Sequence, residues 1–330
     1  MNSDQISNMS YWDQIRTSQG NEACKTAFIE NAKKDVRQAV SQLNDNRLAF
    51  PCLYILHEPI LQQHAQRYLN MRNMTALQLI NQVKGYKAVG MNTFSAKQKS
   101  SYPVLKWILE TGSKEEILED DYEEVLDLSI SVLINIHKDA DILPSATDVL
   151  FQRNRNDRLI HDLVWALFRF RDPQVLKLIA QRLSSENQKD ANLAAELLHT
   201  DMIEKSALKS GRKEALDAYL DWLEENLPYL YFTDESFQYT SKPEFCTLDL
   251  ERKYLQKGTP SLNKVPIATL APEEQQCMAG FQKLSKDEKR LLSNYSHRIH
   301  NKSISDWQEW LQVPTHEQMK AAKARLEGEE

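Results

Sequence analysis

The sequence predicts an all-α protein in which short helical pairs stack side by side, and three observations favour this class. Of its 330 residues, 41% are apolar and only 8 are glycine, which suits ordered helices better than strands joined by tight turns. Apolar residues recur at helical spacing along much of the chain. Segments between residues 101 and 200 also repeat at intervals of about 30 to 40 residues, the period of stacked helical hairpins.

Two sets of segments carry this repeat. The first helices of the pairs share a short motif and lie at VLKWILETG (104–112), LFQR (150–153) and VLKLIAQRL (175–183). Their partners superimpose at offsets of 34 and 30 residues, as SVLINI from Ser131, WALFRF from Trp165 and AELLHT from Ala195. We therefore expect at least three helical pairs between residues 101 and 225.

Residues 171–200 show the pattern most fully. Asp172 and Pro173 supply an N-cap followed by proline at the first helical position, and the small residues of ANLAAELL let the second helix pack closely. This segment resembles a HEAT-like repeat, which implies an α-solenoid of right-handed, stacked hairpins. The C-terminal part of the chain is also similar to uncharacterised helical proteins of bacteria, a resemblance that implies no activity.

Composition and punctuation divide the rest of the chain. We expect a polar tail (1–20), an N-terminal helical region (21–100), the HEAT-like repeats (101–225), an aromatic-rich irregular segment with a linker (226–268) and a C-terminal helical region (269–330). Apolar residues keep helical spacing from Asn21 to Leu43. The aromatic segment is expected to form either a short hairpin or an irregular packed loop. Capping boxes predict three helix starts near the C-terminus, at Ser285/Glu288, Ser305/Gln308 and Thr315/Gln318.

Several classes of function lack their motifs. The chain has no GxxxxGK[ST], GxGxxG or GxSxG sequence, so we expect no cofactor and favour a protein that is not an enzyme. Its four cysteines are far apart without a CxxC pair, which predicts neither a zinc site nor a dense disulfide framework and favours a reducing cytoplasm. His297 and His300 share a helix face but have no further ligand nearby, so we expect no metal site. No apolar run is long enough to span a bilayer.

The second helices of the pairs predict a binding surface, because second helices line the concave side of a HEAT-like stack. The polar and aromatic residues at helical steps on them are Asn135, Arg158, Asp162, Trp165, Arg169, Asn192, Glu196 and His199. Tryptophan between arginines is typical of binding hot spots. A half-buried tryptophan among ordinary surface residues is the alternative interpretation.

We expect from this surface a non-enzymatic scaffold of the bacterial cytoplasm that binds a protein partner. Some HEAT-like bacterial proteins are DNA glycosylases, and Trp107, Asp162 and Trp165 keep that alternative open. Charge argues against nucleic acid, because residues 101–150 carry 12 acidic and 3 basic side chains while residues 1–100 carry 7 and 12. A self-assembling structural subunit is the third alternative.

Overall fold

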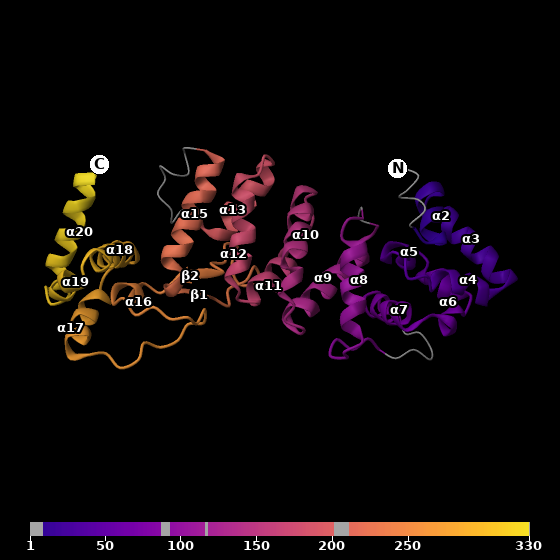
Figure 1. Cartoon of the computed structure of the whole chain (residues 1–330), viewed down its shortest axis with the longest axis horizontal. Coiled ribbons are helices and arrows are strands. Elements are labelled where there is room, and N and C mark those ends of the chain that lie inside the picture. The colour runs from indigo at the N-terminus through magenta and orange to yellow at the C-terminus, as the bar shows by residue number, and fades with distance from the viewer. Residues whose placement is uncertain (1–8, 87–92, 116–117, 201–210, 330) are drawn as a thin grey trace. The chain divides into compact units, whose positions relative to one another are not determined.

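The computed structural model describes residues 9–86, 93–115, 118–200 and 211–329 and divides the chain into two compact units, Met1–Phe170 and Arg171–Glu330 (Figure 1). Nearly all regular structure in the described ranges is helical, which confirms the all-α class. Each unit is described below by itself. The five predicted parts of the chain stay a prediction.

The first unit contains α-helices and two 3-10 turns. They are α2 (Tyr11–Gln19), α3 (Asn21–Lys34), α4 (Val36–Leu43), α5 (Phe50–Ile55), α6 (His57–Gln62), η1 (Ala65–Tyr68), α7 (Met71–Val83), α8 (Ser101–Gly112), α9 (Asp120–Asn135), η2 (Ala140–Ile142), α10 (Leu143–Arg155) and α11 (His161–Arg169). Helix α9 packs between α8 and α11, and α10 packs against α11.

The second unit adds a small sheet to its helices. Its elements are α12 (Pro173–Ala180), η3 (Gln181–Ser184), α13 (Gln188–Leu198), α15 (Arg212–Asn226), η5 (Leu227–Tyr229), β1 (Leu230–Phe232), β2 (Cys246–Leu248), α16 (Leu250–Tyr254), α17 (Pro272–Phe281), α18 (Lys286–Lys302), α19 (Ile304–Leu311) and α20 (Thr315–Glu329). The strands pair antiparallel, with Tyr231 opposite Thr247, so the hairpin alternative for the aromatic segment is the one observed.

Helices occupy the segments in which the sequence predicts first and second helices. Helices α8 and α10 contain the first two motif segments, and α12 together with η3 contains the third. Helices α9, α11 and α13 contain most of the predicted partner segments. Asp172 caps α12 by accepting the Gln174 backbone N–H at 2.8 Å, and Pro173 is the first helical residue. The solenoid arrangement of these pairs is not established by the helix bounds and stays a prediction.

The N-terminal residues pack more closely than their polar composition suggests. Within residues 11–19, expected to lie in a tail, helix α2 buries Trp12 completely. The Trp12 indole N–H donates to the Ala39 carbonyl at 3.3 Å, and its ring meets Phe28 edge to face. Further on, helical spacing does not continue unbroken to Leu43, because Asp35 adopts an extended conformation and caps a new helix, α4.

The C-terminal helices form their own apolar core. Its fully or nearly fully buried members are Tyr254, Leu255, Cys277, Met278, Phe281, Leu292, Met319 and Ala322. The predicted capping box at Ser285/Glu288 is confirmed at the start of α18. The second is wrong by two residues, since Ser303 caps α19. At the third, Gln318 is buried and accepts a hydrogen bond from the Tyr254 hydroxyl instead of serving in a cap.

Gly112, the last residue of α8, allows a close approach that gives a direct test of packing in the first unit. A Cβ there would lie 2.8 Å from Tyr122 Oη, 3.0 Å from Phe50 Cδ1 and 3.2 Å from Leu126 Cδ2. Gly112→Ala is therefore expected to lower the free energy of unfolding by about 1–3 kcal/mol through overpacking, despite alanine's better helix propensity. Urea unfolding measures this change in the free energy of unfolding, with Ser145→Ala on the exposed side of α10 as the control. Unchanged or increased stability of Gly112→Ala would contradict the tight fit.

Candidate functional site

The sequence-predicted residues of the first unit include a cluster on the exposed side of α11. Asp162 and Arg169 are exposed and Trp165 is half-buried. The Arg169 guanidinium carbon lies 5.5 Å from the centre of the Trp165 ring, which is a cation–π distance. Helical spacing therefore brings these three side chains to one face of α11.

Arg158, just before α11, is already engaged within the protein. Its Nη2 donates to Asp120 Oδ1 at 2.6 Å, and its Nε donates to Glu123 Oε1 at 3.3 Å. Both acceptors lie on α9. These ion pairs use two of the five guanidinium donors and hold the segment before α11 to α9.

Asn135, the last residue of α9, is half-buried. Its side-chain oxygen is buried and accepts no hydrogen bond from any residue that the structure describes. A buried unpaired acceptor is uncommon in proteins.

A buried arginine that the sequence did not single out organises the same helices. Arg153 on α10 is 4% exposed and donates to Asp127 Oδ2 at 2.6 Å and to the Glu123 carbonyl at 3.1 Å. Burial raises the pKa of Asp127 to about 6, although Arg153 acts in the opposite direction. Periodicity could not find this pair, because Arg153 looks like an ordinary polar residue in its own helix.

The remaining predicted residues lie on α13 of the second unit. Asn192 and Glu196 are exposed, and Asn192 Oδ1 accepts a hydrogen bond from Gln188 Nε2 at 2.7 Å. His199 ends the helix in the left-handed conformation, with φ at 48°. These three residues belong to the second unit, and a binding surface that they share with the predicted residues of the first unit stays a prediction.

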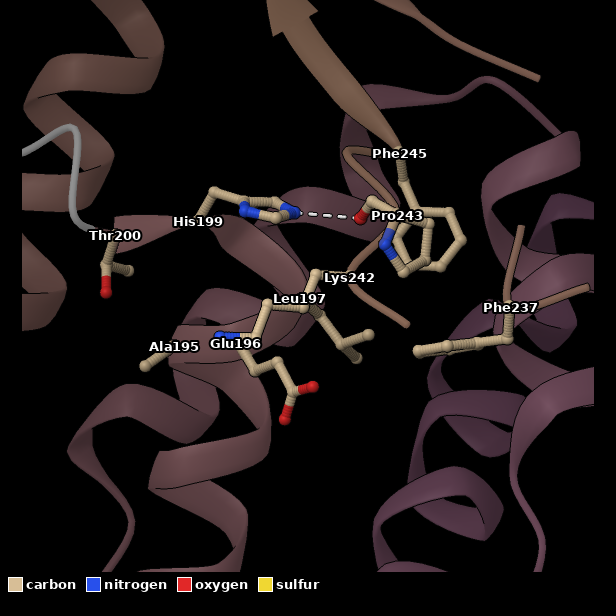
Figure 2. Close-up of a pocket in the computed structure, with 9 residues that line it drawn as sticks. All are labelled: Ala195, Glu196, Leu197, His199, Thr200, Phe237, Lys242, Pro243 and Phe245. Carbon is tan, nitrogen blue, oxygen red and sulfur yellow. Dashed lines mark hydrogen bonds between the residues drawn. The ribbon is translucent and has the colours of Figure 1, made fainter. Parts of the chain in front are cut away.

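A pocket of about 600 Å³ opens beside the end of α13, within the second unit (Figure 2). We call it the α13 pocket. Its lining comes from α13 with the two residues after it and from the loop between β1 and β2, and consists of Ala195, Glu196, Leu197, His199, Thr200, Phe237, Lys242, Pro243 and Phe245. Two sequence-predicted residues, Glu196 and His199, therefore line it. Its volume is in the range of ordinary ligand pockets.

The loop between β1 and β2, which forms the pocket wall opposite α13, is held by hydrogen bonds among its own residues. The Thr233 backbone N–H donates to the Phe245 carbonyl at 2.9 Å, and its hydroxyl donates to the Glu244 carbonyl at 2.6 Å. The Glu244 N–H donates in turn to Glu235 Oε2 at 2.8 Å. These bonds satisfy the backbone of a long irregular loop, so that its aromatic residues can line a pocket in a fixed position.

The two walls are joined by one hydrogen bond. His199 Nε2 lies 2.8 Å from the Pro243 carbonyl oxygen, and because a carbonyl only accepts, the imidazole carries its proton on Nε2 (Figure 2). Phe237 and Phe245 meet edge to face with ring centres 5.6 Å apart. The Phe237 side chain points toward Leu197 across the pocket (Figure 2). The pocket thus has an apolar floor with a fixed rim.

Opposite charges lie at this rim. Glu196 and Lys242 are both exposed, and neither forms an ion pair within the described part of the chain. A carboxylate, an ammonium group and an imidazole held by a carbonyl around an apolar floor suit binding and orientation of a ligand. Sequence reasoning found Glu196 and His199 by repeat position but missed Lys242 and Phe237, for which the density of aromatic residues in 229–245 was the available signal.

A second hollow of the same unit differs in chemistry. It encloses about 590 Å³ and is lined by Pro173, Leu227, Pro228, Gly258, Thr259, Pro260 and Leu262. None of these side chains is charged, and Thr259 is the one polar side chain in this lining, so the hollow offers fewer groups to orient a polar ligand. The α13 pocket is therefore the better candidate site.

Neither a metal-binding cluster nor a membrane-spanning helix is found in the described ranges. No group of three or more His, Cys, Asp or Glu side chains there is placed to hold a metal ion. The His297 ring is hydrogen-bonded to Gln256 and Asn301, and the His300 ring packs against Trp307. Among the described helices, none combines the length and the apolar character needed to cross a bilayer.

Comparison with known proteins identifies no relative of the chain. No protein-family model, no curated protein and no solved structure matches the chain.

Proposed function

We propose that the chain is a non-enzymatic protein-binding scaffold of the bacterial cytoplasm, built on a HEAT-like array of helical pairs. The alternation of α8 to α13 in first and second helices supports the repeat. Exposed side chains on second helices α11 and α13 support a binding role for those faces. The chain would act by shape and charge, with no bond made or broken.

The α13 pocket is the observation that carries this proposal. An apolar floor of Leu197, Phe237 and Phe245 takes a large aliphatic or aromatic side chain, which is how a peptide anchors in a groove. Glu196 and Lys242 then pair with a basic and an acidic residue of the same segment. The occupant that fits is an extended peptide segment with one apolar anchor between opposite charges.

The α11 face offers a second contact of the same kind. Trp165 presents part of its ring under the Arg169 guanidinium, and Asp162 is exposed one turn away. An aromatic ring with an arginine donor provides contact area at a low cost in side-chain entropy.

The nucleic-acid alternative has less support. Binding to a duplex needs many lysine and arginine contacts to phosphates, yet Arg153 and Arg158 are occupied by the carboxylates of α9. Self-assembly has no observation that favours it over a peptide partner. Both alternatives enter the test as outcomes.

The test is selection of peptides from a displayed random library on the folded, full-length chain. Enriched peptides are expected to carry an apolar anchor between opposite charges. Phe237→Ala and Glu196→Lys should each weaken binding and raise the dissociation constant by about tenfold or more, which corresponds to about 1.4 kcal/mol of binding free energy. Gln188→Ala, exposed on the same helix and outside the pocket, is the matched control and should bind as wild type does. Fluorescence anisotropy with the labelled peptide measures all four proteins.

Three outcomes would contradict the proposal. The first is a library that yields no enriched sequence. The second is a peptide whose affinity is the same for wild type and for both pocket variants. The third is salt-dependent binding of a DNA duplex, or concentration-dependent oligomers in light scattering, in the absence of any peptide binding; these would favour the DNA-binding and self-assembling alternatives respectively.

A further inference from the structure

The imidazole of His297, on α18, has both ring nitrogens engaged, although the residue is only 8% exposed. Its Nδ1 lies 2.9 Å from Gln256 Oε1, and its Nε2 lies 3.0 Å from Asn301 Nδ2. Because the Gln256 oxygen also accepts the Tyr229 hydroxyl at 2.9 Å, it serves as an acceptor, and Nδ1 carries the imidazole proton. The lone pair of Nε2 then accepts a hydrogen bond from the Asn301 amide. Both contacts fit the neutral ring.

Titratable groups from three other elements face this ring. Glu225 Oε1, on α15, lies 3.5 Å from His297 Nε2 and 3.6 Å from the Nζ of Lys253, on α16. The Tyr229 ring, on η5, meets the imidazole edge to face with ring centres 5.6 Å apart. On α18 itself, His300 acts on His297 electrostatically from one turn away. One carboxylate oxygen is thus shared by Lys253 and His297.

Lys253 places a positive charge in this group that has little compensation. It is 1% exposed, and its Nζ donates to Asn226 Oδ1 at 2.6 Å and to Asn294 Oδ1 at 2.8 Å. Neither amide oxygen carries a formal charge. Glu225 is the one ion-pair partner of Lys253 among the described residues, and the Glu225 side chain is 53% exposed, so water screens its charge. A second cation beside Lys253 is therefore poorly balanced.

Protonation of His297 creates that second cation. The new proton on Nε2 removes the acceptor of the Asn301 amide, and the imidazolium shares Glu225 with the Lys253 ammonium group. Asn301 is exposed and can rotate its amide, so the lasting cost is the removal of a second cation from water. Burial first, and Lys253 second, therefore lower the pKa of His297, although Glu225 acts in the opposite direction.

We propose that protonation of His297 in mildly acidic solution loosens the last turns of α18, residues 297–302, from α15 and α16. The preceding turns are held differently. Ser293 and Ser296 donate to backbone carbonyls of α16 at 2.8 and 2.6 Å, and these bonds contain no titratable group. The opening is therefore confined to the residues from 297 onward. The proposal goes beyond the peptide-binding function, since none of these residues lines the α13 pocket.

The direction of the pH effect follows from the lowered pKa of His297. An unperturbed histidine titrates near about pH 6.5. Below that pH the opened segment takes up a proton that the closed segment resists, so acid favours opening until the pH falls below the pKa of the closed state. Each unit by which closure lowers the pKa weakens the closed state by up to about tenfold. The contact is therefore most stable above about pH 7.

The experiment uses the folded, full-length chain and two readouts. Histidine NMR titration should place the pKa of His297 below about 6.5. Hydrogen exchange with mass spectrometry, corrected for the pH dependence of intrinsic exchange, should show that peptides covering residues 297–302 lose protection by about threefold or more between about pH 7.5 and about pH 5. His316→Gln, at an exposed histidine of the same unit, is the matched control and should behave as wild type does.

Variants of the charged groups separate titration from packing. His297→Gln should abolish the acid-dependent loss of protection, since an amide does not titrate in this range. Lys253→Met removes the facing cation and should raise the pKa of His297, whereas Glu225→Gln should lower it; these two shifts decide the matter if His297→Gln does not fold. Three results would overturn the proposal. They are a His297 pKa at or above about 6.5, an equal loss of protection in wild type and His297→Gln, and a pKa that neither charge variant moves.

Discussion

Arg153→Ala is expected to lower the free energy of unfolding of the first unit by about 3 kcal/mol at neutral pH, because it leaves a buried carboxylate without its counterion. Arg153 is 4% exposed, and its Nη1 lies 2.6 Å from Asp127 Oδ2. Truncation removes this ion pair and the hydrogen bond to the Glu123 carbonyl at once. Urea unfolding followed by circular dichroism measures the change, with exposed Arg155→Ala on the same helix as the matched control.

The pH dependence separates the lost ion pair from lost packing. Burial raises the pKa of Asp127 to about 6 in the folded chain, from 3.8 in the unfolded one. A raised carboxyl pKa means that the native state binds the proton more tightly, so the Asp127 contribution to stability increases as the pH falls from about 7 to about 4. Protonated Asp127 carries no charge, so it does not require the Arg153 guanidinium as a counterion. The loss of unfolding free energy caused by Arg153→Ala should therefore be smaller at about pH 5 than at about pH 7. An equal loss at the two pH values would mean that it comes from packing alone.

Lys253→Ala is expected to destabilise the second unit by about 3 kcal/mol, through a cavity and an unpaired buried amide oxygen. Lys253 is 1% exposed, and its Nζ donates to Asn226 Oδ1 at 2.6 Å and to Asn294 Oδ1 at 2.8 Å. Glu225 Oε1 lies 3.6 Å away. The ammonium group thus joins α15, α16 and α18, and burial lowers its pKa.

Two further variants apportion this effect. Lys253→Met keeps the apolar stem and removes the donors, so it should lose about 1 kcal/mol. Lys283→Ala, exposed after α17, is the matched control and should stay within about 0.5 kcal/mol of wild type. Thermal and urea unfolding of all three variants decide the matter. Equal stability of Lys253→Ala and wild type would mean that the buried ammonium group contributes nothing to the junction of the three helices.

The helices themselves were largely predictable, because their signals are local. Asp172 and Pro173 start α12 with a side-chain cap and a fixed φ. The break at Asp35 was the exception: apolar spacing continues across it, and only the capping geometry of the aspartate reveals two helices. Local rules therefore predict which segments are helical better than they predict where each helix ends.

The candidate site was predictable only in part, because it depends on contacts between distant residues. Repeat position led to Glu196 and His199, which lie within one helix and the residue after it. Lys242 and Phe237 join them through a loop whose path is set by hydrogen bonds such as that between Thr233 and Glu244. No periodicity in the sequence specifies such a path.

The burial of Trp12 limits where a truncated form of the first unit can begin. One turn of α2 reaches three other segments, since Trp12 contacts Phe28 on α3 and the Ala39 carbonyl on α4, while Asp13 Oδ2 accepts the Ala49 N–H at 2.9 Å. A fragment that begins after Gly20 would lack α2. It would expose the aromatic ring of Phe28 to solvent, and an exposed apolar surface promotes aggregation. Useful fragment boundaries of the first unit therefore lie before Ser10, whose hydroxyl is itself bonded to Asp13.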